Sequence, residues 1–329
     1  MTTISKYKDA TVKVYPGYGH THNLVVYGHV FANKYITRDN YTNNVLSNSI
    51  HLIKLFLLKP LAGVNVQLIW NNQLLTFTTE EDGFFKFEWN SEVEMPAGWH
   101  PVTVNLMEGI NIAASSESKV FIPHIAQYAF ISDIDDTVLI SHSATIMKRL
   151  SVLFSNNPHT RKAFTEVVRH YQLLATAHVE PGIPNPFFYV SGSEWNLYVD
   201  LHEFFSHNKL PEGIFLLNQL KRWFQLLRTG KTKHEGKLLR IVRIFEVFPK
   251  QRFVLLGDNS QSDPAIYSSI IRKYPERVFA VYIRNVHEGN EIATRKLLAA
   301  MEKEHIYTCF FKNAEEAIRH SKEIGLIDE

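Results

Sequence analysis

Three carboxylates follow a single apolar run in this sequence. The run in QYAFISDIDDTVLI, residues 127–140, ends at Asp133, and Asp135 and Asp136 come directly after it. Two carboxylates about 4 Å apart repel by roughly 4 kcal/mol at an effective dielectric near 20, so an uncompensated cluster would protonate or unfold locally. Mg²⁺ removes that conflict, because it prefers carboxylate oxygens and keeps waters that a phosphate can replace. The stretch therefore predicts a magnesium–phosphate site.

Other polar residues stand at the ends of other apolar runs. Ser191 and Gly192 follow PFFYV, and Asp258 and Asp263 belong to GDNSQSD, which follows RFVLL. Ligands of an open parallel sheet bind outside the carboxyl ends of its strands, so these residues and Asp133 should converge on one crevice. The Ser191 hydroxyl and the Gly192 amide can donate to phosphate oxygens at a strand-to-helix turn.

The elements that must position these residues change type along the chain. Residues 11–123 contain short β-prone runs separated by turn residues, which predicts an antiparallel β-sandwich. After residue 127, apolar strands such as RFVLLGD and VFAVYIR alternate with helical stretches, which predicts an α/β fold with a parallel sheet covered on both faces. We expect a β-sandwich domain over residues 1–124 and an α/β domain over residues 125–329, with a small helical insertion at about residues 139–182.

The motifs, taken in order and in strand context, resemble the haloacid dehalogenase superfamily of phosphate-handling enzymes. This resemblance covers roughly the C-terminal 200 residues: DIDDT is the first motif, Ser191 the second, a lysine before the next helix the third, and GDNSQSD the fourth. YVSGSEWNLY, FPKQRFVLLGDNSQSDPAIY and the N-terminal GYG resemble more closely the actin-patch-associated phosphatidate phosphatase family, over nearly the whole chain. That family usually has serine and glycine where Asn259 and Ser260 stand here, so the sequence leaves the geometry of this loop open.

The resemblance implies a Rossmann-like catalytic domain and a role for each acid. Asp133 would be the nucleophile that becomes an aspartyl phosphate, and it would also bind the metal. Asp135 would protonate the leaving oxygen, then deprotonate the hydrolytic water, while its carbonyl reaches the metal. Asp258 and Asp263 would complete the metal site. The family motif does not require Asp136, which is either a buried structural acceptor or an outer contact of the metal site.

The phosphate-binding lysine has three candidates. The stretch KTKHEGK contains Lys231, Lys233 and Lys237. Lys237 opens the helical stretch KLLRIVRIFEVF, which leads into the strand of the fourth motif, and it matches the place of the lysine in the superfamily. We expect Lys237 to contact phosphate, with Lys233 as the second choice.

The resemblance and the residues together predict a magnesium-dependent phosphomonoester hydrolase whose candidate substrate is phosphatidate or a related lipid phosphate. A phosphotransferase using the same intermediate and a non-catalytic binding or scaffold protein stay open as alternatives. A net charge of +2, from 35 basic and 33 acidic residues, creates no global field that would attract nucleic acid. The apolar run from Ile50 to Leu58 and the basic segment from Lys221 to Arg243 are the candidate contacts with a membrane surface.

The sequence favours a cytoplasmic protein. Its single cysteine, in YTCFF, excludes an internal disulfide and is expected to be a small buried hydrophobe. The N-terminus shows no basic segment followed by an apolar core, so we expect no secretory signal. The most apolar run, residues 50–60, is too short to span a bilayer. The oligomeric state stays open.

Overall fold

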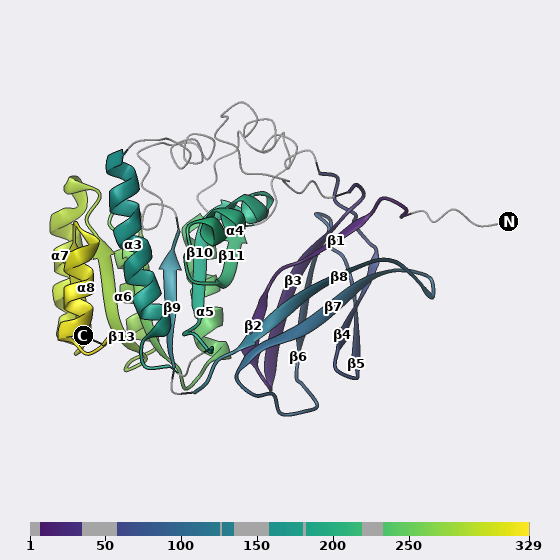
Figure 1. Cartoon of the computed structure of the whole chain (residues 1–329), viewed down its shortest axis with the longest axis horizontal. Coiled ribbons are helices and arrows are strands. Elements are labelled where there is room, and N and C mark those ends of the chain that lie inside the picture. The colour runs from purple at the N-terminus through teal and green to yellow at the C-terminus, as the bar shows by residue number, and fades with distance from the viewer. Residues whose placement is uncertain are drawn as a thin grey trace. The chain divides into compact units, whose positions relative to one another are not determined.

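The fold comprises two compact units, one ending at His124 and the other beginning at Ile125 (Figure 1). Each is described by itself. The structure is a computed structural model, and it describes residues 7–34, 58–125, 127–134, 158–179, 182–218 and 233–328.

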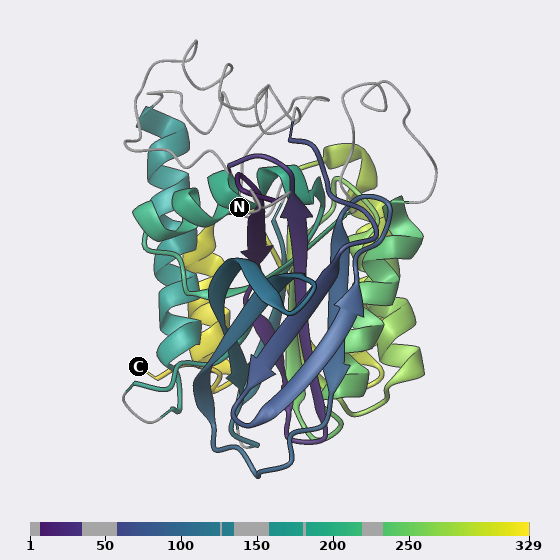
Figure 2. The same cartoon turned by 90° about the vertical axis from the view of Figure 1, so that its right-hand side faces the viewer.

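In its described residues, the first unit is built from eight hydrogen-bonded strands (Figure 2). Their order is β1-β3-β2-β8-β7-β4-β5, with β6 paired to β3. Neighbouring strands are antiparallel except β2 and β8, which are parallel. The strands are β1 (Thr11–Val14), β2 (Gly17–His20), β3 (Asn23–Phe31), β4 (Asn65–Trp70), β5 (Gln73–Thr78), β6 (Phe84–Trp89), β7 (Gly98–Glu108) and β8 (Asn111–Ile122).

Alternating side chains give this unit its core. In β4 the residues Val66, Leu68 and Trp70 are buried while their neighbours are less so, which is the two-residue period of a strand with one face against a core. They join a hydrophobic cluster that also contains residues of β1, β3, β6, β7 and β8. The predicted antiparallel β-structure is therefore confirmed, and the arrangement as a two-layered sandwich stays a prediction.

The part of the second unit that the structure describes is a six-stranded sheet with helices. Its order is β11-β10-β9-β12-β13-β14, and all neighbouring strands are parallel. The strands are β9 (Tyr128–Asp133), β10 (Phe187–Glu194), β11 (Gly213–Asn218), β12 (Arg252–Asp258), β13 (Val278–Arg284) and β14 (Tyr307–Phe311). The helices are α3 (Pro158–Thr176), α4 (Tyr198–His207), α5 (Lys233–Val247), α6 (Asp263–Lys273), α7 (Glu291–Glu302) and α8 (Ala314–Glu323), with short 3₁₀ turns at Trp195–Leu197 and Glu288–Asn290.

Helices cover both faces of this parallel sheet. Figure 2 shows α3 (teal) and α8 (yellow) on one side of the sheet and the green helices α5 and α6 on the other. Every residue of β13 is buried, as expected for a strand covered on both faces. The strand order reverses between β9 and β12, and ligands of such sheets bind where the order reverses. The predicted α/β architecture with a parallel sheet is confirmed.

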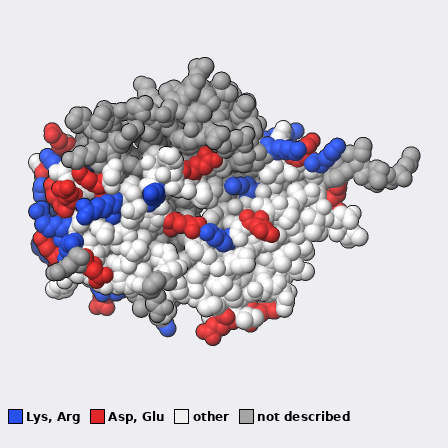
Figure 3. Space-filling view, viewed as in Figure 1, with Lys and Arg blue, Asp and Glu red and all other residues white. Residues whose placement is uncertain are grey.

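Three further expectations meet the structure here. No helix in the described part of the chain is long and apolar enough to cross a bilayer. Cys309 is buried, as predicted, and burial raises the pKa of its thiol to about 12, assisted by Glu316 and Glu323, so it is held as a thiol. The apolar run of residues 50–57 and most of the basic segment of residues 221–243 lie outside the described residues. On the face shown in Figure 3, Lys and Arg side chains are interspersed with Asp and Glu.

Candidate active site

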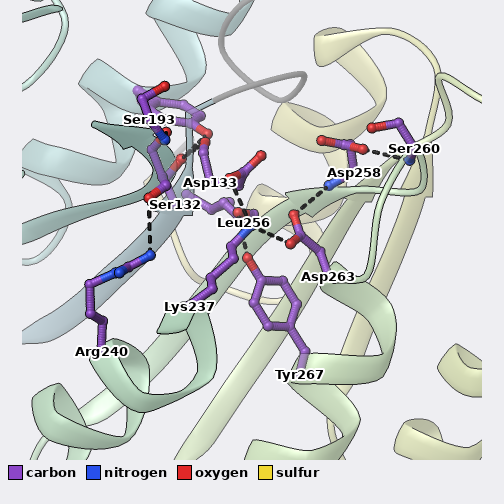
Figure 4. A network of polar contacts seen from close by, with 12 residues as sticks. Ser132, Asp133, Ser193, Lys237, Arg240, Leu256, Asp258, Ser260, Asp263 and Tyr267 are labelled. Carbon is purple, nitrogen blue, oxygen red and sulfur yellow. Dashed lines mark hydrogen bonds and ion pairs between the residues drawn. The ribbon is translucent and has the colours of Figure 1, made fainter. Parts of the chain in front are cut away.

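Three buried carboxylates meet at the point where the strand order reverses. Asp133 is the last residue of β9, Asp258 is the last residue of the neighbouring β12, and Asp263 is the first residue of α6. Their exposed fractions are 2%, 0% and 0%, and one carboxylate oxygen from each lies within 4.8 Å of the others (Figure 4). The prediction that these three acids converge is confirmed, although Asp133 and Asp263 are 130 residues apart in the chain.

Lys237 lies between two of these carboxylates. It is on the first half of α5, and its Nζ donates to Asp133 Oδ1 at 2.7 Å and to Asp263 Oδ1. Burial lowers the pKa of Lys237, but Asp133 and Asp263 together outweigh it and the pKa is raised. The side chain is therefore a buried ammonium, and the structure places this predicted lysine in the site.

Carboxylates gather with basic side chains in the described part of this cluster. Three carboxylates meet one ammonium, that of Lys237. Arg284, the register partner of Asp258 on β13, and Arg240 of α5 add positive charge at the same edge of the sheet. Burial raises the pKa of Asp263 even though Lys237 lowers it, so its negative charge is costly in this buried place. An all-oxygen donor set in which anionic charge is costly is chemically suited to a hard divalent cation such as Mg²⁺.

The serine segment, Ser191–Ser193, lies at the same edge of the sheet. The predicted strand-to-helix turn is wrong in detail: these residues belong to the last part of β10, where its pairing with β11 is irregular. Val190 of β10 pairs in register with Asp133 of β9, so Ser191 and Gly192 lie just beyond the level of Asp133. Ser191 is fully buried, and its Oγ accepts a hydrogen bond from the backbone N–H of Ser193 at 2.9 Å. An acceptor role for Oγ leaves the hydroxyl hydrogen to be donated elsewhere. The predicted phosphate donors are thus placed at the edge where the carboxylates meet.

The departure from the family pattern after β12 has a structural reason. The buried Asn259 side chain accepts N–H bonds from Val286 at 2.8 Å and His287 at 2.9 Å, and it donates to the His287 carbonyl at 2.8 Å. A serine is too short to make all three bonds. The Ser260 N–H donates to Asp258 Oδ1 at 2.5 Å, so the loop still fixes the carboxylate.

Several residues that support the site were not anticipated. Ser132 Oγ donates to the carbonyl of Asp133 at 2.8 Å and contacts the Tyr171 hydroxyl at 2.8 Å. Arg240 of α5 donates to the Ser191 carbonyl at 3.1 Å. A polar Ser132 inside an otherwise apolar strand was a usable signal, and so was the position of Arg240 one helical turn after Lys237. No sequence pattern indicated Tyr171.

Some predicted residues cannot be placed. Asp135, Asp136 and Lys231 lie outside the described residues. Lys233 begins α5, but its side chain is not described. The acid–base role of Asp135 stays a prediction.

The fold and the site define an α/β protein with an acidic, oxygen-lined centre at the carboxyl ends of its parallel strands. Residues 128–285 match the family model described as "Phosphatidate phosphatase APP1, catalytic domain". The predicted resemblance to this phosphatidate phosphatase family is thereby confirmed for these residues, which carry every described residue of the site.

Two curated proteins support the match. The chain is 29% identical over 160 residues to Phosphatidate phosphatase APP1 of Saccharomyces cerevisiae, which is 47% of this chain and 25% of that protein. It is 25% identical over 194 residues to an uncharacterized protein of Schizosaccharomyces pombe, which is 55% of this chain and 30% of that protein. The chain therefore spans only about a quarter to a third of these relatives.

Solved structures give only loose alignments. A carbohydrate acetylesterase from Xanthomonas citri aligns with a TM-score of 0.34 and 8% identity, over 96% of this chain and 75% of that one. A β-glucuronidase from Ruminococcus gnavus aligns with a TM-score of 0.24 and 9% identity, over 92% of this chain and 53% of that one. At these TM-scores the likeness carries no information on function.

Proposed function

We propose that this protein is a magnesium-dependent phosphomonoester hydrolase that acts through an aspartyl-phosphate intermediate, with phosphatidate or a related lipid phosphate as its substrate. The observation that carries the proposal is the buried cluster of Asp133, Asp258 and Asp263 with Lys237. The family match of residues 128–285 supports phosphatidate as the substrate. The sequence-derived role of Asp135 is part of the proposal.

The proposed roles follow from position and contacts. Asp133 attacks phosphorus: a bond forms between its carboxylate oxygen and phosphorus, and the bond from phosphorus to the leaving oxygen breaks. Asp135 gives a proton to that oxygen, then accepts one from the water that hydrolyses the aspartyl phosphate. Lys237 holds the Asp133 carboxylate and contributes positive charge beside the phosphate. Ser191 and the Gly192 amide donate to the phosphate oxygens.

Asp133, Asp258 and Asp263 would hold the metal, each in a different way. A bound divalent cation would screen the repulsion between the carboxylates and the phosphate. Both oxygens of Asp263 already accept hydrogen bonds, from Lys237 and from the Asp258 N–H at 3.3 Å. We therefore assign Asp258 as the direct ligand and Asp263 as a residue that orients its neighbours or a metal-bound water.

We further assign residues 125–329 to a catalytic domain of the haloacid dehalogenase type and residues 1–124 to a β-sandwich domain. Counted along the chain, the strands of the parallel sheet stand in the order 3-2-1-4-5-6, and this Rossmann-like order supports the first assignment. The single cysteine favours a reducing compartment, so we propose the cytoplasm.

Hydrolysis of an aryl phosphate, with and without Mg²⁺, tests the reaction. Asp133→Asn keeps the shape of the side chain but loses the attacking anion, so turnover should fall to background while the thermal unfolding temperature shows a folded protein. Asp328→Asn is the control, because Asp328 is exposed and pairs only with His178 among the contacts seen for it. Substantial hydrolysis by Asp133→Asn, or equal wild-type rates in EDTA and Mg²⁺, would contradict the mechanism.

The substrate is tested separately. Phosphatidate in anionic vesicles should be hydrolysed faster than a short soluble phosphomonoester, and added salt should reduce the rate by screening the vesicle surface. Faster turnover of the soluble ester, with no vesicle binding at low salt, would contradict the proposed lipid substrate and leave the phosphatase proposal intact.

A further inference from the structure

Two backbone carbonyls of the serine segment at the end of β10 are held by side chains from neighbouring elements. Arg240 Nη2 donates to the carbonyl of Ser191 at 3.1 Å, and Arg240 Nη1 donates to Asn218 Oδ1 at 3.1 Å. Asn218, the last residue of β11, in turn donates through Nδ2 to the carbonyl of Gly192 at 3.4 Å. One guanidinium and one amide thus link α5 and β11 to successive carbonyls of the serine segment.

These contacts fix the direction of the N–H groups of the serine segment. In a planar trans peptide the C=O and the following N–H point in opposite directions. Holding the Ser191 carbonyl toward Arg240 therefore directs the Gly192 N–H away from Arg240. Holding the Gly192 carbonyl likewise directs the Ser193 N–H, which donates to Ser191 Oγ and so orients that hydroxyl. Both predicted phosphate donors, the Gly192 amide and the Ser191 hydroxyl, are thereby set.

We propose that Arg240, together with Asn218, is a positioning residue that orients the serine segment at the end of β10 for binding a phosphate group. This inference rests on the proposed function. Arg240 stands three residues after Lys237 on α5, so one helix face carries both the ammonium that holds Asp133 and the guanidinium that holds the serine segment. A single helix, α5, therefore fixes the position of Asp133 relative to the serine segment.

The shape of the guanidinium matters more than its charge in this arrangement. A guanidinium presents two N–H groups in one rigid plane, and Arg240 uses them on two different acceptors, each at 3.1 Å. A lysine ammonium is a point charge on a flexible stem and does not reproduce that fork. If Arg240 acted by attracting the phosphate electrostatically, lysine would replace it.

The test measures inorganic phosphate binding by calorimetry in Mg²⁺, and kcat and KM for an aryl phosphate, for wild type, Arg240→Gln and Arg240→Lys. Both substitutions should weaken phosphate binding about ten-fold or more and raise KM, while Mg²⁺ affinity measured without phosphate stays unchanged. Asn218→Ser breaks the link to Gly192 but spares the Arg240–Ser191 bond, so it should give a smaller loss. Arg295→Gln is the matched control, since Arg295 is an exposed arginine paired with Glu291 on α7.

The outcomes separate the two proposals. Wild-type phosphate affinity in Arg240→Lys assigns the effect to charge and overturns the positioning role, as does wild-type affinity in Arg240→Gln. A parallel loss of Mg²⁺ affinity and of thermal stability makes Arg240 merely structural and also overturns it. If Arg240→Gln does not fold, Asn218→Ser decides, and unchanged phosphate affinity there overturns the role. If the wild type is active and the variants equal it, this inference alone is rejected. If the wild type neither binds phosphate nor hydrolyses the aryl phosphate, the proposed function and this inference are both rejected.

Discussion

Replacing Lys237 with methionine should destabilise the metal-free protein by several kcal/mol, and Mg²⁺ should restore much of the loss. Methionine keeps most of the buried volume and removes the charge. At an effective dielectric near 20, the ion pair at 2.7 Å with Asp133 is worth about 6 kcal/mol before the cost of burying both charges. Removing one partner of a buried pair typically costs about 3–5 kcal/mol, because the other charge is left uncompensated. Here two carboxylates, Asp133 and Asp263, lose their counter-ion.

Thermal unfolding in EDTA and in excess MgCl₂ measures the effect. For a unit of about 200 residues, 3–5 kcal/mol corresponds to a fall in unfolding temperature of about 10 °C. A cation bound by the carboxylates stabilises only the folded state, so the Mg²⁺-induced rise should be larger in Lys237→Met than in wild type. Lys273→Met is the control, because Lys273 is half-exposed and lies 3.8 Å from Glu246, a surface pair of little energetic value.

Two results would refute this reasoning. A loss below about 1 kcal/mol in EDTA would mean that the carboxylates are not ionised together, because ionised partners cannot lose their buried counter-ion cheaply. A loss of the expected size that Mg²⁺ leaves unchanged would mean that the cluster does not bind the metal.

Three further predictions concern the surroundings of the site. In Gly257→Ala the new Cβ would lie 2.6 Å from Asp263 Oδ2, so thermal unfolding should show a loss of about 1–3 kcal/mol and activity should fall. Burial, with a smaller effect of a neighbouring histidine, lowers the pKa of His170 to about 3, so the unfolded chain binds the extra proton between pH 6.5 and 3. The contribution of neutral His170 to the free energy of unfolding is therefore full above pH 6.5 and is lost as the pH falls, by up to about 5 kcal/mol. Urea unfolding of His170→Gln should show a weaker dependence on acid pH than wild type. Tyr171→Phe removes the hydroxyl that contacts Ser132, so steady-state kinetics should show a lower kcat with little change in KM.

Matched variants control these predictions. Gly236→Ala brings a new Cβ no nearer than 3.4 Å to its neighbours, so equal destabilisation by both glycine changes would contradict the steric argument. Tyr189→Phe removes a buried hydroxyl that donates to the Pro211 carbonyl, and an equal fall in kcat there would assign the Tyr171 effect to general packing. An acid dependence of His170→Gln that equals that of wild type would show that His170 is not the group that takes up the proton.

The sequence predicted the acids of the site because their positions follow from local rules. Asp133 and Asp258 each end an apolar run, and runs of that length without alternation are typical of buried parallel strands. Carboxyl ends of parallel strands share one edge, so the convergence of these acids needed no knowledge of the full fold. Lys237 was predicted from its place in the motif order, and the structure puts its ammonium against Asp133.

The supporting residues could not be predicted because their partners are distant in sequence and share no pattern. Tyr171 reaches Ser132 across 39 positions, and Arg240 reaches Ser191 across 49. Tyr171 and Arg240 are ordinary helix residues in sequence. Only the packing of each helix on the sheet determines which residue the polar end of the side chain contacts.

These distant contacts explain how a cluster of like charges can be part of a stable fold. The carboxylates repel one another, so contacts with other residues must hold the ends of β9 and β12 in place. Below Asp133, the Ser132 hydroxyl is committed to the Asp133 carbonyl, so the Tyr171 hydroxyl must be the donor in its bond to Ser132. Below Asp258, the Tyr267 hydroxyl donates to the Leu256 carbonyl at 2.8 Å.

Burial raises the pKa of both tyrosines, in each case assisted by nearby acids, so both remain neutral donors at any pH at which the protein is folded. Neutral hydroxyl donors fix the two strand ends without cancelling the negative charge between them. Lys237 pairs with two of the carboxylates, and a divalent cation bound beside them would screen their charge from an anionic phosphate. Neutral hydrogen bonds from the surrounding helices therefore fix the geometry of the site, and the carboxylate charges stay available for chemistry.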